Sequence, residues 1–162
     1  MAEYTVTGYY ETDHDRLDEL FKHFQQLKRT DFTKARLCFK EFKFGLQRHI
    51  IWEEEILFPL FEQKTGLVHG GPTEVMRREH RLIGKYLEDI HEKVKAQNPD
   101  SDDDELMLLY TLLAHNQKEE QILYPAIDRA ITEPERGNVF STMKNMPEER
   151  YSYCCTPENR KK

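Results

Sequence analysis

Cysteine is scarce in this sequence, and its placement excludes a disulfide framework. Cys38 stands alone, while Cys154 and Cys155 are adjacent in the C-terminal segment "YSYCCTPENRKK". Adjacent cysteines lack the C-x-x-C spacing of a redox or zinc motif, and three cysteines are too few to staple a small secreted scaffold. We therefore expect a reducing compartment, namely the cytoplasm.

Long apolar runs are also missing. No stretch approaches the roughly eighteen consecutive apolar residues that cross a bilayer. The N-terminal segment "MAEYTVTGYYETD" has neither the basic start nor the apolar centre of a signal peptide. With 162 residues, 33% of them charged, the chain has the length and composition of one soluble domain with no membrane partner.

A concentrated basic face is absent as well. The formal net charge is −6, with charges of both signs interspersed, and the one basic cluster, Arg160 to Lys162, lies at the C-terminal end. A protein that binds nucleic acid needs lysine and arginine gathered on one surface. We therefore expect no nucleic-acid partner.

Strand signals are nearly absent, and helix signals dominate. Capping residues, prolines and acidic runs predict four long helices. Their expected ranges are about Thr12 or Asp13 to Arg29, Thr33 to Glu62, Pro72 to Ala96, and "SDDDE" to Ile131. Short turns between long helices predict an all-α, up-down-up-down antiparallel four-helix bundle over residues 1–133. Residues 134–162 are expected to form a partly ordered C-terminal extension with one short helix around Val139 to Lys144.

One segment of the sequence occurs twice. Residues 49–59 read "HIIWEEEILFP", and 66 residues later the chain reads "HNQKEEQILYP". Pro59 and Pro125, which close the two copies, are expected in the last turns of the second and fourth helices, where each removes a backbone hydrogen bond and bends the exit. An internal duplication of a helical hairpin is the simplest account of the repeat.

The same offset relates further polar residues, because the "DH" at residues 13–14 falls on the "EH" at residues 79–80. Three polar coincidences are therefore His14 with His80, His49 with His115, and Glu53 with Glu119. At about 100° per residue, each His-x-x-x-Glu pair lies on one helix face among apolar neighbours. On this reckoning Glu54 and Glu120 point away from that face, with Glu54 and Glu55 toward solvent.

Helix levels bring the six residues into one layer. The midpoint between His14 and His49 falls in a predicted loop, as does the midpoint between His80 and His115, so the partners in each antiparallel hairpin meet at one height. Four imidazoles and two carboxylates in a dry core need hydrogen bonds or a metal. A lone buried histidine is more often a hydrogen-bonded core residue, and a lone His-x-x-x-Glu pair a surface ion pair, but the repeated constellation favours metal.

The ligand set indicates which metal. A zinc site would be complete with four ligands and, when structural, is usually rich in thiolate, whereas no cysteine belongs to this layer. Two divalent ions that share Glu53 and Glu119, with two histidines each, fit better. Mixed nitrogen and oxygen ligation suits iron, with manganese as the alternative.

These motifs resemble those of the hemerythrin-like proteins, the family with the His-His-Glu cation-binding domain. The resemblance covers about residues 10–131 and rests on His14, "HIIWE" at 49–53, "EH" at 79–80 and "HNQKE" at 115–119. It implies two non-haem iron ions inside a four-helix bundle, with bridging carboxylates and a coordination position that takes O2 or a related small ligand.

The sequence departs from the oxygen carriers of that family at one position. Those proteins place two histidines four residues apart on the third helix, and here the partner position of His80 is Met76. Met76 is expected as a core filler, with ligation by its sulfur or by water left open. The departure makes simple oxygen carriage less expected and favours peroxide or nitric oxide chemistry, or iron handling.

Three functional classes remain open at this stage. The first is a di-iron protein that captures or senses O2, NO or peroxide. The second is an enzyme that acts on peroxide or NO, or a protein that repairs iron clusters. Repair members of the family carry an additional N-terminal cysteine-containing domain, whereas this chain begins almost directly at the bundle, which lowers that expectation. The third is a metal-free helical interaction module.

A few neighbouring residues complete the expectations. Trp52 is expected in ordinary core packing, and Tyr9 and Tyr10 are minor candidates for covering the open end of the bundle near His14. Tyr10 is the repeat counterpart of Met76. The remaining histidines, His23, His69 and His91, are expected outside the layer.

Overall fold

All regular structure in residues 5–152, the range that the computed structural model describes, is helical. The order of elements is α1 (Val6–Leu27), α2 (Phe32–Trp52), η2 (Glu53–Leu57), α3 (Phe58–Thr65), α4 (Pro72–Lys95), α5 (Asp102–Lys118), η3 (Glu119–Leu123), α6 (Tyr124–Ala130), α7 (Glu133–Asn145) and η4 (Glu148–Ser152). The all-α prediction is confirmed. Cys154, Cys155 and the basic cluster at residues 160–162 lie outside the described residues.

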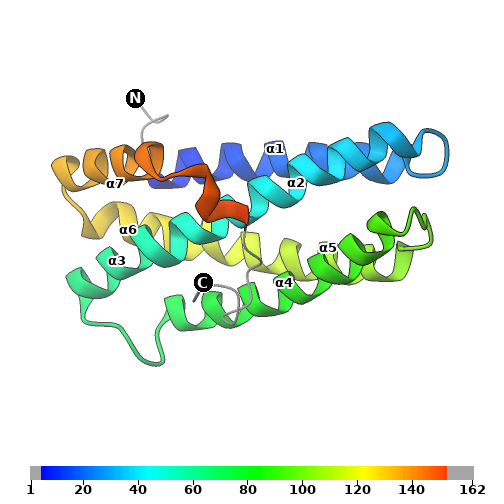
Figure 1. The fold of residues 1–162 in the computed structure, drawn as a ribbon. Coiled ribbons are helices and arrows are strands. Elements are labelled where there is room, and N and C mark those ends of the chain that lie inside the picture. Colours follow the sequence, from blue (N-terminus) through cyan, green and yellow to red (C-terminus); the bar gives the residue numbers. More distant parts are fainter. Residues whose placement is uncertain (1–4, 153–162) are drawn as a thin grey trace.

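Four long helical stretches lie lengthwise beside one another (Figure 1). They are α1, α2 continued by α3, α4, and α5 continued by α6. The principal packing partners are α1 with α2 and α4 with α5, and α6 also contacts α1 and α3. Side chains from all four stretches can therefore meet in one interior.

The first helix starts seven residues earlier than the sequence predicts. Its N-cap is Thr5, whose hydroxyl accepts a hydrogen bond from the Gly8 N–H at 3.0 Å. The carboxylate of Asp128 accepts hydrogen bonds from the Val6 and Thr7 N–H groups at 2.8 and 3.0 Å. Thr12 and Asp13 are residue types that cap helices, so the sequence suggested a start there. The actual start depends in part on Asp128, which is distant in the sequence and gives no local signal.

The C-terminal helix α7 is longer than the predicted Val139 to Lys144. Thr132 and Glu135 form a reciprocal capping box, and Pro134 lies in the first turn, where a proline fits a helix. The Trp52 indole N–H then donates to the Tyr151 hydroxyl at 2.7 Å, which fastens η4 to α2. Pro134 is thus part of a helix start, although it reads as a break in the sequence.

The two repeated prolines begin helical segments and do not end them. Each follows a five-residue π-turn, η2 or η3, in which the Phe58 or Tyr124 N–H donates to the carbonyl oxygen of Glu53 or Glu119. The helices then continue through α3 and α6 for 8 and 7 residues. The prediction that the prolines mark helix exits was wrong, because the wider turn accommodates a residue that lacks an N–H and crowds the preceding turn.

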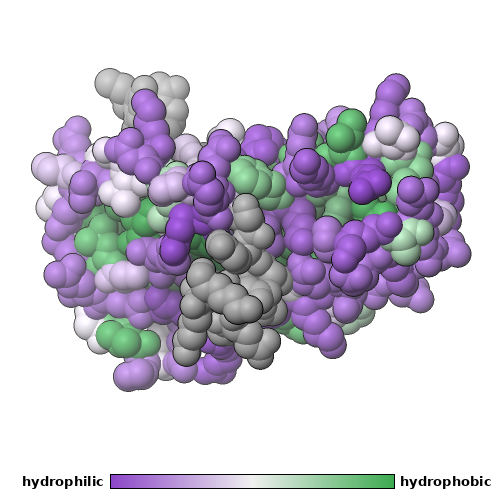
Figure 2. Space-filling view, viewed as in Figure 1, coloured by the Kyte–Doolittle hydropathy of each residue, from purple (hydrophilic) through white to green (hydrophobic). Residues whose placement is uncertain are grey.

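The hydrophobic core consists of two clusters. One contains Tyr10, Met76, Tyr124 and their neighbours, and reaches Val139, Met143 and Tyr151. The other is centred on Phe21, Phe39, Ile83 and Leu87. The outer surface on the side shown in Figure 2 is mostly hydrophilic, as amphipathic helices around a buried interior require.

Among residues 5–152 we find no helix with the length and apolar character needed to cross a membrane.

Candidate metal centre

The structure brings together all six polar residues that the repeat singles out. Each exposes 4% or less of its surface. The six are His14 on α1, His49 on α2, Glu53 in η2, His80 on α4, His115 on α5 and Glu119 in η3. Such complete burial of four imidazoles and two carboxylates is costly unless the groups compensate one another or bind an ion.

The histidines form two pairs with their Nε2 atoms facing one another. The Nε2 atoms of His14 and His49 are 3.2 Å apart, and those of His80 and His115 are 3.1 Å apart. Each pair combines one residue from each helix of a hairpin, as the predicted common height requires. Two nitrogen donors therefore converge at each of two points in the layer.

Each glutamate directs its two oxygens to different histidine pairs. Glu53 places Oε1 3.5 Å from His49 Nε2 and Oε2 3.1 Å from His80 Nε2. One oxygen thus faces each pair, so that this carboxylate can interact with both pairs at once.

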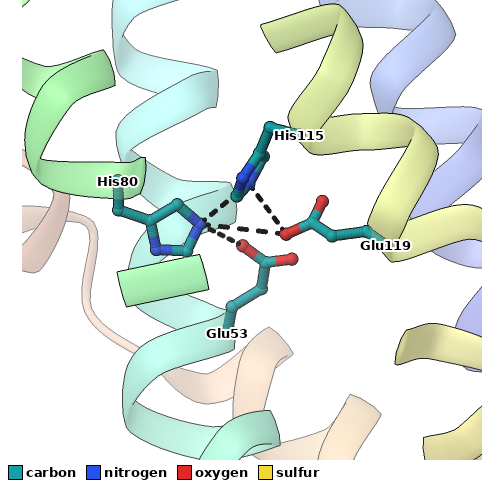
Figure 3. A group of neighbouring side chains, drawn as sticks. All are labelled: Glu53, His80, His115 and Glu119. Carbon is teal, nitrogen blue, oxygen red and sulfur yellow. Dashed lines mark hydrogen bonds and ion pairs between the residues drawn. The ribbon is translucent and has the colours of Figure 1, made fainter. Parts of the chain in front are cut away.

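Glu119 repeats the pattern from the other half of the chain. Its Oε2 lies 3.3 Å from His14 Nε2, and its Oε1 lies 2.9 Å from His115 Nε2 and 3.8 Å from His80 Nε2. Figure 3 shows Glu119 and Glu53 converging on His80 and His115. Two overlapping groups have ligand atoms that all lie within 4.8 Å of one another: Glu53, His80, His115 and Glu119, and His14, His49 and Glu119.

Some atoms in this layer make no hydrogen bond. Among residues 5–152 these include Glu53 Oε2, Glu119 Oε1 and His80 Nδ1, all buried; the two oxygens lie near histidine Nε2 atoms, as given above, but without the geometry of a hydrogen bond. A buried polar atom without a partner costs about 1–3 kcal/mol, and more when charged. Two of the three are carboxylate oxygens on the inner side of the layer, so the donor set fits a bound cation.

The charges of the layer are strongly coupled. Burial alone lowers the pKa of His49, but the charge of Glu53 and hydrogen bonds to Asp13 and Glu53 outweigh it and raise the pKa to about 10. Burial raises the pKa of Asp13, but hydrogen bonds from His49 and Arg16 lower it to about 2. Without a metal, His49 is therefore held as a cation between carboxylates.

The second histidine pair behaves in the same way. Burial opposes the charged form of His80 and His115, but the neighbouring carboxylates, Glu119 foremost among the hydrogen-bond partners of His80, raise both pKa values. Burial opposes the charged form of Glu119, yet the histidines hold its pKa well below the usual range. Because metal ligation needs neutral imidazoles, metal uptake must release these protons.

Four outer carboxylates face the Nδ1 atoms of the four histidines. Asp13 lies 2.8 Å from His49 Nδ1, and Glu79 lies 3.1 Å from His115 Nδ1. Carboxylates in this position fix the tautomer and orientation of a metal-ligating imidazole.

Glu54 and Glu120 supply the other two outer carboxylates. Glu120 is 2.7 Å from His14 Nδ1, and Glu54 is 3.6 Å from His80 Nδ1, beyond hydrogen-bond range. The prediction that these residues point away was wrong, and the side chain of Glu54 is only 6% exposed. The reason is the π-turn at each site, which breaks the 100° spacing after Glu53 and Glu119 and keeps two consecutive glutamates near the layer.

The sequence held a signal for this outer shell. Asp13 and Glu79 occupy equivalent positions of the repeat, as do Glu54 and Glu120. Acidity was therefore preserved at the same offset of 66 residues as the inner six. A repeat-wide comparison of charge, without an assumption of regular helix geometry, finds all four.

Tyr124 is a further polar residue of the site that the sequence prediction missed. Its hydroxyl donates to Glu119 Oε2 at 2.7 Å, contacts Glu53 Oε1, and lies 3.3 Å from His49 Nε2. Burial, with the charges of the two glutamates, raises its pKa well above the ordinary value, so the phenol keeps its proton. The only sequence signal is that Tyr124 replaces Phe58 in the second copy of the repeat.

Aromatic rings close the layer on the same side. The Tyr10 ring meets the His49 ring edge-on at 4.7 Å, and the Phe58 ring is parallel to the His80 ring at 5.9 Å. Tyr10 is fully buried, Tyr9 is 36% exposed, and Met76 packs in the hydrophobic cluster around Tyr10. Water is thereby excluded from this side of the site.

We expect Asp13→Asn to weaken iron binding by about 10- to 100-fold, because the outer carboxylate no longer orients His49 or compensates its charge. The measurement is a competitive iron titration with a chromogenic chelator. Asp15→Asn is the matched control, since Asp15 is exposed two residues away and carries the same charge. Equal iron affinity in the two variants would contradict the assigned role of Asp13.

The fold and the site together define a helical protein whose buried layer of histidine and glutamate is suited to cations. The Hemerythrin HHE cation binding domain matches residues 5–127, and the chain therefore belongs to this family. Membership implies an iron-binding protein, in agreement with the histidine and glutamate groups of the structure.

Three relatives among characterised proteins carry the same name. The chain is 34% identical over 96 residues to the "Iron-sulfur cluster repair protein YtfE" of Edwardsiella ictaluri, covering 56% of this chain and 43% of the relative. It is 28% identical to the protein of that name from Enterobacter sp., covering 63% and 49%, and 27% identical to the one from Salmonella typhimurium, covering 61% and 48%. The chain thus matches about half the length of these relatives. No solved structure matches it.

Proposed function

We propose that this protein holds two non-haem iron ions, with His14, His49, Glu53, His80, His115 and Glu119 as ligands, and uses them to capture or sense O2, NO or peroxide. The observation that carries the proposal is the division of each glutamate between the two histidine pairs. A single ion would leave two imidazoles and two carboxylate oxygens without a role. Manganese is the alternative metal on the same donor set.

A small cavity beside the layer supports a small ligand. It measures about 10 Å³, which is about the space that one water molecule needs. Three of the histidines border it, and the rest of the lining is mostly apolar, including Leu46, Ile50, Ile83 and Leu112. A space of this size is compatible with a ligand of very few atoms and too small for an organic substrate.

The residues around the layer have distinct tasks in this proposal. Asp13 and Glu79 accept the Nδ1 protons, so that the Nε2 atoms face inward without protons. Tyr124 keeps a hydroxyl proton next to both glutamates. Bound iron would supply the open coordination position and the change of oxidation state that small-ligand chemistry needs.

Iron-cluster repair is the second candidate, and the name that these relatives carry favours it. In that case the bound iron is cargo, and its release to a damaged protein is the function. A di-iron enzyme that acts on peroxide or NO is the third. All three candidate functions use the same site. They differ in what the site releases: the unchanged small ligand, the iron itself, or the product of a reaction.

The proposal includes the organisation of the chain. We take residues 1–133 as an up-down-up-down antiparallel four-helix bundle of hemerythrin type, and residues 134–162 as a C-terminal extension. We also propose that the protein is cytoplasmic and that it has no nucleic-acid partner.

The test is to purify the protein without a histidine tag, measure iron per chain, and record absorption spectra as O2, NO or peroxide is added. About two irons per chain and a reversible spectral change with a small ligand are expected. Rapid peroxide or NO consumption would instead assign an enzyme, and transfer of iron to an iron–sulfur protein stripped of its cluster would assign repair. Protein that takes up no iron, and is no more stable when iron is offered, contradicts the proposal.

A further inference from the structure

A second concave region lies away from the metal layer, between α2 and α4. It measures about 470 Å³ and contains none of the six proposed ligands. Its lining combines cations, aromatic rings and one amide: Arg36, Leu37, Phe39, Lys40, Lys43, Phe44, Gln47, His91, Val94, Lys95 and Tyr151. We call it the α2–α4 groove. Its volume is within the range of about 300–1,000 Å³ that is common for small-molecule sites.

The cations of the α2–α4 groove come mainly from one face of α2. Arg36, Lys40 and Lys43 follow one another at the spacing of four and then three residues, which aligns them on a helix. Like charges at this spacing repel one another and weaken the helix. In a chain of net charge −6, this face of α2 is therefore a local concentration of positive charge that would attract an anion.

The neighbouring carboxylates compensate only part of this charge. Lys43 Nζ lies 2.8 Å from Glu88, and Lys95 Nζ lies 3.3 Å from Glu92. The side chains of Arg36 and Lys40 make no ion pair or hydrogen bond with any residue in the described range 5–152, and both residues are exposed. The groove therefore keeps two uncompensated positive charges, which matches the charge of a phosphate monoester.

The opposite end of the α2–α4 groove is aromatic. Phe44 and Tyr151 meet edge to face, with ring centroids 5.6 Å apart. Gln47 lies beside them, 3% exposed, and its Nε2 is buried without a hydrogen-bond partner in the structure. A buried amide without a partner is costly, and Gln47 lines the groove, so a change of its side-chain rotamer would let the acceptor of a bound molecule satisfy the amide.

The distance between the two ends of the α2–α4 groove is comparable to the length of a small organic molecule. Lys40 and Gln47 are seven residues apart on α2, or about 10 Å along the helix axis. Figure 2 views the face where α2 and α4 lie side by side, and hydrophobic patches show there between hydrophilic side chains. One end of the groove thus offers cations that can bind a phosphate, and the other end offers aromatic side chains and one amide donor.

We propose that the α2–α4 groove binds a small phosphorylated compound with a planar ring, of the mononucleotide class. The phosphate lies against Arg36 and Lys40, and the ring lies against Phe44 and Tyr151 with an acceptor on the Gln47 amide. The site is independent of the metal layer, so it stands or falls separately from the proposed iron chemistry.

Titration calorimetry of the full chain with adenosine monophosphate tests the site, with adenosine and inorganic phosphate as separate arms. Binding of the monophosphate, tighter than that of either fragment, is expected. Arg36→Glu and Lys40→Glu should each weaken it at least about 10-fold, because a charge-assisted contact becomes a repulsion. Lys85→Glu is the matched control, since it removes an exposed lysine of α4 outside the groove, and should leave binding within about twofold of wild type.

Gln47→Met provides a test that charge screening cannot mimic. The variant keeps the length of the side chain and removes the amide, so binding should fall by about 3- to 10-fold while the free protein melts at the same temperature or higher. Circular dichroism melts show whether each variant folds. The proposal is overturned if adenosine monophosphate gives no saturable heat, if phosphate alone binds equally well, or if Lys85→Glu weakens binding as much as Lys40→Glu.

Discussion

Glu119→Ala is expected to reduce bound iron from about two ions per chain to less than one. Glu119 is the one residue common to both groups of candidate ligands, with one oxygen toward His14 and the other toward His115. Its removal takes a ligand from both ions at once and leaves the Tyr124 hydroxyl without one of its acceptors. Loss of a ligand and its charge from a buried site costs several kcal/mol, which is a loss of about 1,000-fold or more in affinity.

Metal analysis after gel filtration, together with the absorption spectrum, measures the loss. Glu55→Ala is the matched control: Glu55 is in the same repeat, two residues after Glu53, but is exposed and pairs with Arg150. It should retain iron at the wild-type level. A Glu119→Ala protein that is folded and holds two irons would show that the glutamate does not bridge the ions.

Lys28→Met is expected to destabilise the metal-free protein by about 3–5 kcal/mol, far from the metal layer. Lys28 is only 4% exposed, and its Nζ lies 2.6 Å from Asp102 and 2.5 Å from Glu105. Glu105 is 2% exposed and also accepts a hydrogen bond from Gln25 at 3.1 Å. Without the ammonium group, a buried carboxylate would remain at the junction of α1 and α5 with no cation.

Urea unfolding of metal-free protein measures this effect. The double variant Lys28→Met with Glu105→Gln should recover most of the lost stability, because the orphaned charge is then removed as well. Lys34→Met, which alters an exposed pair with Asp31, should change stability by less than about 0.5 kcal/mol. If the single variant at Lys28 changes stability as little as the control, the buried pair is energetically neutral.

The sequence predicted which six polar side chains meet in the buried layer, because the information is local and duplicated. His49 and Glu53 lie one helical turn apart, and the second copy repeats them as His115 and Glu119. The structure places all of these in one buried layer, together with the two histidines of α1 and α4. Periodicity and a repeat suffice here because Glu53 and Glu119 are the first residues of their π-turns, and the residues between each histidine and its glutamate are still regular α-helix.

The outer shell was mispredicted for a reason that periodicity cannot capture. Glu54 and Glu120 lie in π-turns, and a single wider turn changes the direction of each following side chain. The start of α1 escaped for another reason, because Asp128 holds the Val6 and Thr7 amides across more than 100 residues of sequence. Both errors concern geometry that is set by tertiary contacts.

The division of the hydrophobic core into two clusters has a consequence for how the molecule responds to iron. Tyr124 belongs to one cluster and Leu112 to the other, and the charged layer sits where the two are parted. In metal-free protein this layer holds His49 and His80 as cations among buried carboxylates, so opening of the layer would let water reach these charges. Iron that binds only the closed form at about 1,000 times its dissociation constant would add about 4 kcal/mol to stability. The backbone amides of both clusters would then exchange with solvent more slowly, so that bound iron could be read as hydrogen-exchange protection on both sides of the layer.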